Sequence, residues 1–135
     1  MAIDTAIVIY FAERNERYID AVRPLFEAAD RGELRLVTSA ITLLEVLVVP
    51  YRAGDAVLAA RYEELLSRSR GLSLVDLGRP ILRAAAHLRA LHGVRTPDAI
   101  QLAAGLAERC GCFLTNDRRL PELPTLPVLQ LADLL

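Results

Sequence analysis

Four acidic residues from distant parts of the chain could together form a metal site: Asp4, Glu45, Asp98 and Asp117. Asp4 follows the opening residues MAI, and Asp117 follows the apolar stretch CFLT after one residue. Glu45 lies within ITLLEVLVV, and Asp98 heads the apolar stretch TPDAIQLAAGLAERC. If the strands are parallel, strand ends and helix starts share one edge of the sheet, so we expect the four carboxylates to converge there.

A cluster of carboxylates needs protons or cations to neutralise it. Two carboxylates about 5 Å apart repel by roughly 3 kcal/mol at an effective dielectric constant near 20. A set of oxygen ligands without nearby histidine or paired cysteine suits Mg²⁺ or Mn²⁺ better than zinc. A metal held in this way activates water and binds a phosphodiester, which is the chemistry of a nuclease.

Three of the acids also have a purely structural interpretation, which the sequence leaves open. Asp98 would complement the dipole of its helix, at the margin of a polar stripe that includes Gln101. Asp4 would cap the helix that follows it. Asp117 would form a turn with Asn116.

Glu45 interrupts an apolar run, where an uncompensated buried charge would cost several kcal/mol. Its structural alternative is a capping box with Thr42, three residues earlier.

The elements that would position these acids alternate between strand and helix. The expected strands are MAID, LRLVTS, LSLVDL, CFLT and, as a strand or extended tail, VLQLADL. The first three expected helices are TAIVIYFAE, residues 16–32 with a kink or join at Pro24, and AITLLEVLVV, which Ser39 would cap and Pro50 would interrupt. The other three are residues 55–70, 80–92 and 96–109, the last with Pro97 in its first turn. This order predicts an α/β protein with three layers, α/β/α, and a mostly parallel sheet. The length of 135 residues fits a single domain over residues 1–135.

The charge composition excludes several classes of protein. The formal net charge is −1, which rules out a nucleic-acid binder that works by bulk positive charge. All 16 basic residues are arginine, so phosphate loops of the Walker type, Schiff-base enzymes and receiver or dehalogenase domains that use a lysine are excluded. The hydrophobic share of 53% leaves apolar surface for a partner, so we expect an oligomer or a bound protein.

Cysteine, histidine and targeting signals point to no other chemistry. Cys110 and Cys112 are too close for an ordinary disulfide and are expected to be buried small side chains. His87 and His92 are five residues apart, on different helix faces, and are not expected to be catalytic. The apolar run AIVIYFA is much shorter than a membrane span and lacks a basic leader, so we expect a cytoplasmic protein without a membrane anchor.

Taken in order, the motifs resemble those of PIN domain proteins, specifically the VapC-type toxin ribonucleases. MAIDTAIVIYFAE resembles the opening acid motif, LVTSAITLLEV the segment leading to a glutamate, TPDAIQLAAGLA the third-acid helix, and CFLTNDRRL the strand end with the fourth acid. The similarity covers nearly the full chain.

The resemblance implies a function and assigns roles to residues. It implies an endoribonuclease that depends on Mg²⁺ or Mn²⁺, is homodimeric, acts as the toxin of a toxin–antitoxin pair and is held inactive by a cognate antitoxin. It gives Asp4, Glu45, Asp98 and Asp117 metal-binding roles, and makes Thr5, Thr42 and Asn116 polar neighbours that orient carboxylates, water or phosphate.

The arginines nearest the motifs are candidates for contact with the RNA backbone: Arg118, Arg119, Arg14 and Arg95. Their structural alternative is a solvated rim or surface ion pairs. With no tryptophan and 5% aromatic residues, a base-stacking platform is not expected.

Two other functions remain open. Ala6 stands where PIN proteins often have Asn or Ser, which favours a silent PIN-like module that binds protein or RNA without cutting it. A Mg²⁺-dependent phosphatase or phosphate-accepting signalling domain would suit a similar sheet, but the absence of lysine argues against both.

Overall fold

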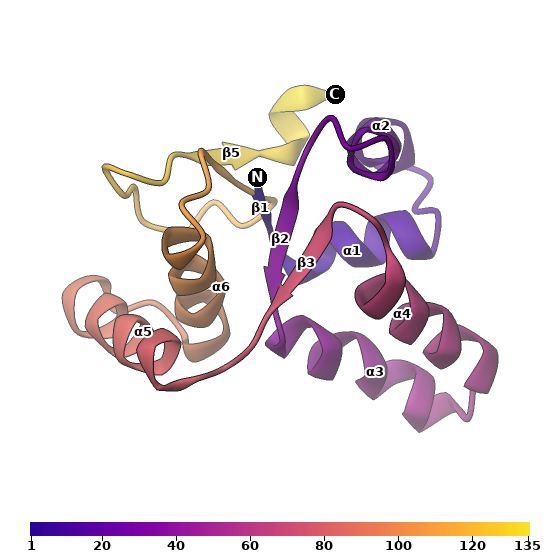
Figure 1. Cartoon of the computed structure of the whole chain (residues 1–135), viewed down its shortest axis with the longest axis horizontal. Helices are drawn as coiled ribbons and strands as arrows, with labels where there is room; N and C mark the ends of the chain where they lie inside the picture. Colours follow the sequence, from indigo (N-terminus) through magenta and orange to yellow (C-terminus); the bar gives the residue numbers. More distant parts are fainter.

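Five short strands form one parallel sheet in the centre of the protein (Figure 1). The computed structural model describes residues 1–135, and the strands are β1 (Ala2–Ile3), β2 (Leu36–Ser39), β3 (Leu72–Val75), β4 (Phe113–Thr115) and β5 (Val128–Gln130). Their order across the sheet is β3-β2-β1-β4-β5, and every neighbouring pair is parallel. The stretch VLQLADL is therefore an edge strand followed by a short 3₁₀ helix (Leu131–Leu134).

Six helices cover the two faces of the sheet. One group comprises α1 (Thr5–Ala12), α2 (Ile19–Asp30), α3 (Ile41–Ala53) and α4 (Ala56–Arg68), and the other α5 (Arg79–His92) and α6 (Thr96–Ala107). Figure 1 shows the first group on one side of the strands and the second on the other. The expected three-layer α/β/α architecture is confirmed.

Each face of the sheet has its own hydrophobic core, because neighbouring residues of a strand point to opposite faces. Ile3, Leu36 and Leu114 pack with α1 to α4. Their strand neighbours Ala2, Val37 and Phe113 pack with α5 and α6. Since all six side chains are buried, the central strands are apolar on both sides, as parallel strands usually are.

Several expected helix boundaries differ from those in the structure. Pro50 does not interrupt α3, which continues to Ala53, and Pro24 lies inside α2. Ser39 does not cap α3, because the N-cap is Ala40 and the buried Ser39 hydroxyl has no hydrogen-bond partner. Tertiary packing along the sheet overrides these local signals.

Gly71 shows why one connection needs glycine. It precedes β3 with a φ of 78°, a backbone conformation that side chains with a Cβ rarely adopt. A Cβ there would lie 2.2 Å from the carbonyl oxygen of Ala29 in α2. The close approach of α2 to β3 therefore depends on this glycine.

None of the helices is long and apolar enough to cross a membrane.

Candidate functional site

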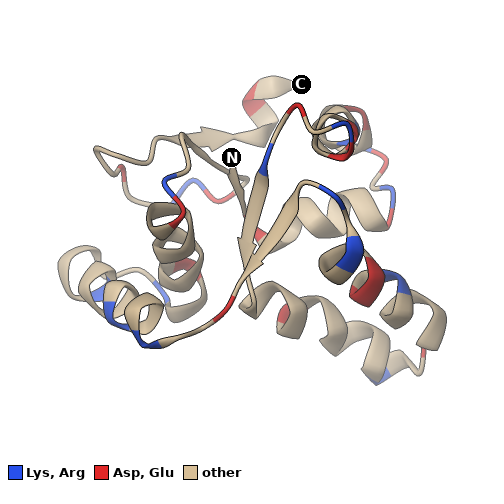
Figure 2. Cartoon of the chain, viewed as in Figure 1, with Lys and Arg blue, Asp and Glu red and all other residues tan.

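The acids lie where the strand order of the sheet reverses. The chain builds β1, β2 and β3 in one direction and then crosses to β4 on the other side of β1. In parallel α/β proteins, ligands bind beyond the carboxyl ends of the two strands at such a point. Asp4 directly follows β1, and Asp117 lies two residues after the end of β4. Figure 2 shows acidic segments where α1 begins and within α3 and α6, around this end of the sheet.

Asp4 is a half-buried acid that two hydrogen bonds hold in place. One carboxylate oxygen caps α1 by accepting from the Thr5 amide at 2.8 Å, and the other accepts from the Thr115 hydroxyl at 2.8 Å. Burial raises the pKa of Asp4 above its ordinary value, the two hydrogen bonds oppose this rise, and the charges of Asp98 and Glu45 add to it. The helix-cap interpretation is confirmed, yet the cap leaves a half-buried carboxylate that is raised in pKa by the charges of two others.

Asp98 reaches the same region from the first turn of α6. Its side chain is 14% exposed and forms an ion pair with Arg95, with 3.3 Å between Nε and Oδ2. The polar stripe expected beside Asp98 is absent, because Gln101 is buried. Asp98 therefore does not belong to a solvated helix face.

Asp117 forms a local turn, but with Arg119 and not with Asn116 as expected, by accepting from the Arg119 amide at 2.9 Å. The Arg119 guanidinium also binds both of its carboxylate oxygens, at 3.0 and 2.9 Å. This hydrogen bonding lowers the pKa of Asp117, and the charges of Arg119 and Arg95 contribute to the decrease. Thr115 links Asp117 to Asp4, because its hydroxyl accepts from the Asp117 amide and donates to Asp4.

Glu45 is linked to the site by a hydrogen bond from Thr5, and it does not form a capping box with Thr42. The Thr5 hydroxyl donates to Glu45 Oε1 at 2.7 Å. Thr42 lies inside α3, fully buried, and its hydroxyl contacts those of Thr5 and Thr38. Thr5 therefore contacts an acid directly, as expected of a polar neighbour. Thr42 instead contacts Thr5.

Gln101, which was expected only in a polar stripe, organises the polar residues beneath the acids. It is 2% exposed; its Nε2 donates to Thr5 and Thr42 at 3.1 and 2.7 Å, and its Oε1 accepts from the Ser39 amide at 3.0 Å. A backbone amide can only donate, so the Ser39 contact fixes the orientation of the Gln101 side chain. Because Thr5 accepts from Gln101, its own hydrogen is free to point at Glu45.

A sequence signal for Gln101 existed but was ambiguous. The residue lies three positions after Asp98, on the same side of α6 as this acid. The same holds for Thr115, which donates to Asp4. In the sequence it is the last residue of an apolar strand, followed by Asn116 and Asp117. Only the packed sheet shows that both side chains point to the site.

Three other candidates have their contacts elsewhere. Asn116 donates to the Tyr10 hydroxyl and accepts from the Ala132 amide, so it holds the C-terminal segment and makes no hydrogen bond to an acid. Arg118 pairs with Asp133 at 2.8 Å. Arg14 follows the far end of α1 from Asp4 and lines a cavity of about 790 Å³ between α1, α2 and α4.

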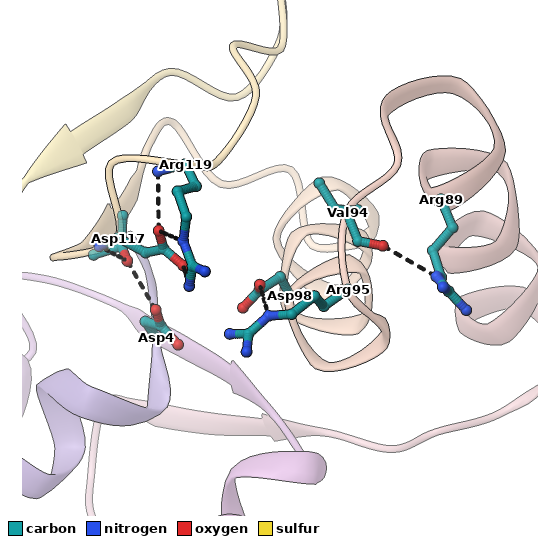
Figure 3. A network of polar contacts seen from close by, with 8 residues as sticks. Asp4, Arg89, Val94, Arg95, Asp98, Asp117 and Arg119 are labelled. Carbon is teal, nitrogen blue, oxygen red and sulfur yellow. Dashed lines mark hydrogen bonds and ion pairs between the residues drawn. The ribbon is translucent and has the colours of Figure 1, made fainter.

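The candidate ligands have the chemistry that Mg²⁺ or Mn²⁺ prefers, but the positions of their side chains match a metal site only in part. All four candidate ligands supply carboxylate oxygens, which these ions prefer. Asp4 in particular is half-buried near like charges and forms no ion pair with a cation. However, no three of the acidic, cysteine or histidine side chains lie close enough together to hold one ion. Arg95 and Arg119 instead neutralise Asp98 and Asp117, so that binding of a metal by either would require a rearrangement (Figure 3).

Comparison with known proteins adds to this geometry. Structurally similar chains occur in VapBC2 of Rickettsia felis bound to a promoter DNA fragment (TM-score 0.73, 17% identity), a toxin–antitoxin complex of Klebsiella pneumoniae (0.71, 21%) and DNA-bound VapBC of Salmonella typhimurium (0.68, 21%). Each comparison covers 96% of both chains. No match was found among proteins of curated function. The sequence matches the PIN domain family over residues 1–126, which is almost its whole length. The chain therefore belongs to the PIN domain family.

Proposed function

We propose that this protein is a metal-dependent endoribonuclease of the VapC type, the toxin of a toxin–antitoxin pair. The observation that carries the proposal is the position of Asp4, a half-buried carboxylate at the point where the sheet order reverses, coupled electrostatically to Asp98 and Glu45. Such an arrangement is unfavourable without a cation and becomes favourable with one. Membership of the PIN domain family supports the nuclease assignment.

In this proposal Asp4 and Asp98 hold Mg²⁺ or Mn²⁺, joined by Asp117 and, directly or through water, by Glu45. When bound, the ion would supply a reactive water and stabilise the negative charge that develops on a phosphodiester. Thr115 and the Thr5 amide hold the Asp4 carboxylate, and the Thr5 hydroxyl orients Glu45. These side chains keep the acids aligned at the carboxyl edge of the sheet.

The toxin assignment is supported by the structural relatives and by the exposed apolar surface. The proposed partners are a cognate antitoxin and a second copy of the chain in a homodimer. All three relatives named above are VapBC or toxin–antitoxin complexes. The α3–α4 pair exposes large apolar side chains, namely Leu44, Val49, Tyr51 and Val57, each more than 60% exposed. Side chains of this kind suit a protein–protein contact.

A silent PIN-like module that binds RNA or protein is the alternative. One observation favours it: Asp98 and Asp117 are already paired with arginines, and no three acids share a position suited to one ion. A silent module would bind its partner without requiring metal.

The direct test is an RNA cleavage assay with purified protein free of any antitoxin. A structured RNA and a DNA of the same sequence are incubated with Mg²⁺, with Mn²⁺ and with EDTA, for the wild type and for Asp4→Asn/Asp98→Asn. Asp55→Asn is the matched control, because Asp55 also caps a helix, α4, but lies outside the site. We expect cleavage of RNA only with metal and only in the wild type and the control. Cleavage in EDTA or by the double variant would refute the metal mechanism, and intact RNA with tight binding would support the silent module.

A further inference from the structure

Two arginines from different elements lie among the acids and pair with them, Arg95 through one contact and Arg119 through two guanidinium hydrogen bonds. Arg95 is the N-cap residue of α6 and pairs with Asp98, and Arg119 follows β4 and pairs with Asp117. Each charge acts beyond its own partner, because Arg95 also lowers the pKa of Asp117 and Asp98 also raises that of Arg119. Figure 3 shows the Arg119 guanidinium beside Asp117 and the Arg95 guanidinium beside Asp98.

A cavity opens between these two pairs. It has a volume of about 210 Å³ and is lined by both arginines, both acids, and His92 and Leu120 among others. The cavity joins the end of α5, the start of α6 and the loop after β4. It therefore places two guanidinium groups directly beside the proposed metal ligands.

We propose that Arg95 and Arg119 exchange partners during binding: they hold Asp98 and Asp117 in the metal-free protein, and bind an RNA phosphate in this cavity when a divalent cation takes up the carboxylates. The proposal rests on the proposed function and deepens it, because it defines a phosphate subsite next to the acids. It also makes cation and RNA binding depend on each other.

The exposure of the paired groups allows such an exchange. The side chains of Arg95 and Arg119 are 66% and 73% exposed, whereas those of Asp98 and Asp117 are 14% and 18% exposed. The carboxylates are thus held by the fold, and the guanidinium groups are free to turn into solvent or the cavity. An exposed ion pair is weak, and a dication carries twice the charge of a guanidinium, so the cation wins the competition for the carboxylates.

A released guanidinium binds phosphate well. Its planar fork of N–H donors matches two phosphate oxygens as closely as it matches a carboxylate. Arg119 already binds Asp117 through two such bonds, so replacing the carboxylate with a phosphate needs no new kind of geometry. By linkage, a cation that frees the arginines strengthens RNA binding, and RNA strengthens cation binding by the same factor.

The test measures the binding of Ca²⁺ and RNA and does not depend on RNA cleavage. Ca²⁺ is titrated into the protein by calorimetry, and a labelled single-stranded RNA oligonucleotide is titrated by fluorescence anisotropy with Ca²⁺ and with EDTA, over a range of salt concentrations. A gel confirms that the RNA stays intact. The variants are Arg95→Met and Arg119→Met, which keep the length of the side chain and remove its charge. Arg31→Met is the matched control, because Arg31 binds Glu33 two residues away through two bonds, as Arg119 binds Asp117, but at the C-terminal end of α2.

We expect the variants to bind Ca²⁺ more tightly, by up to about fivefold for each ion pair removed. They should bind RNA more weakly, with a salt dependence lower by about 0.7 for each phosphate that the variant no longer binds. The gain in RNA affinity on adding Ca²⁺ should be smaller than in the wild type, and Arg31→Met should behave as the wild type does.

Unchanged or weaker Ca²⁺ binding in both variants, or an unchanged salt dependence of RNA binding, would overturn the exchange while leaving the proposed metal site intact. A wild type that binds neither Ca²⁺ nor Mg²⁺ would overturn the proposed function, and this proposal with it.

Discussion

Replacing Asp4 with asparagine should stabilise the metal-free protein, although Asp4 is the central residue of the proposed site. Asparagine keeps the cap of α1, because its side-chain oxygen accepts from the Thr5 amide as the carboxylate does. It removes the repulsion by Asp98 and Glu45 and the cost of burying a charge, which together raise the pKa of Asp4. The residue thus serves binding at the expense of stability.

The magnitude follows from the charges that Asp4 meets. Repulsion of Asp4 by Asp98 and Glu45 is on the order of 2 kcal/mol at an effective dielectric constant of about 20, and solvent near the site reduces it. Against this, the variant loses about 1 kcal/mol from the charge-assisted bond with Thr115 and about 0.5 kcal/mol from the helix dipole. Relief of the desolvation cost adds to the gain, so the net stabilisation by Asp4→Asn is about 1 kcal/mol, which corresponds to about 3–5 °C in Tm for a domain of this size.

The effect should depend on pH in a defined direction. A pKa raised in the folded state means that folding favours protonated Asp4. The contribution of Asp4 to stability is therefore greatest below the unfolded pKa near 3.8 and is lost as the pH rises through the folded pKa. The variant should exceed the wild type most at neutral pH, and the two should converge in acid.

Urea and thermal unfolding in EDTA at several pH values measure this difference. Adding Mg²⁺ should reverse it, because ligand binding stabilises only the protein that retains its site, by about 2.7 kcal/mol at 100 times Kd. Asp55→Asn, which changes a capping aspartate of α4 away from the acids, should show neither effect. An Asp4→Asn protein less stable than the wild type in EDTA at pH 7 would show that the acids do not repel one another.

Three other substitutions test the parts of the site and the fold separately. Gln101→Leu leaves a buried amide and threonine hydroxyls without their partner and should cost about 2–3 kcal/mol in urea unfolding; a loss below about 0.5 kcal/mol would contradict the network. Gly71→Ala forces a Cβ against the Ala29 carbonyl and should cost more than about 2 kcal/mol, so a wild-type urea midpoint would refute the close approach. The pKa of Asp117 is lowered by Arg119, so its ion pair contributes stability above pH 3.8 that is lost as the pH falls. Asp117→Asn should therefore lose less stability than the wild type in acid titrations, and parallel curves would contradict this.

Much of the fold could be predicted from short stretches of the sequence. The alternation of apolar strands and amphipathic helices predicted the three layers, because the period of a strand or helix is set within a few residues. The same local order placed Asp4 after a strand and Asp98 in the first turn of a helix. The rule that parallel strands end at one edge then predicted that the acids share a region.

Local signals failed where long-range packing decided the outcome. Pro50 did not end α3 and Ser39 did not cap it. The capping box of Glu45 was wrong for the same reason, since Thr42 instead contacts Thr5, which is 37 residues away. A helix cap contributes about 1 kcal/mol and a proline inside a helix costs about 3 kcal/mol, both less than burying a whole helix face contributes.

By itself the sequence determined which residues are acidic, which strands and helices carry them and at which edge of the sheet they lie. Only the tertiary structure decided the long-range partners of the acids, which are Thr115 for Asp4 and Thr5 for Glu45. The physical reason is that side-chain hydrogen bonds act over about 3 Å. Their partners are chosen by the relative positions of segments that the chain brings together across as many as 111 residues.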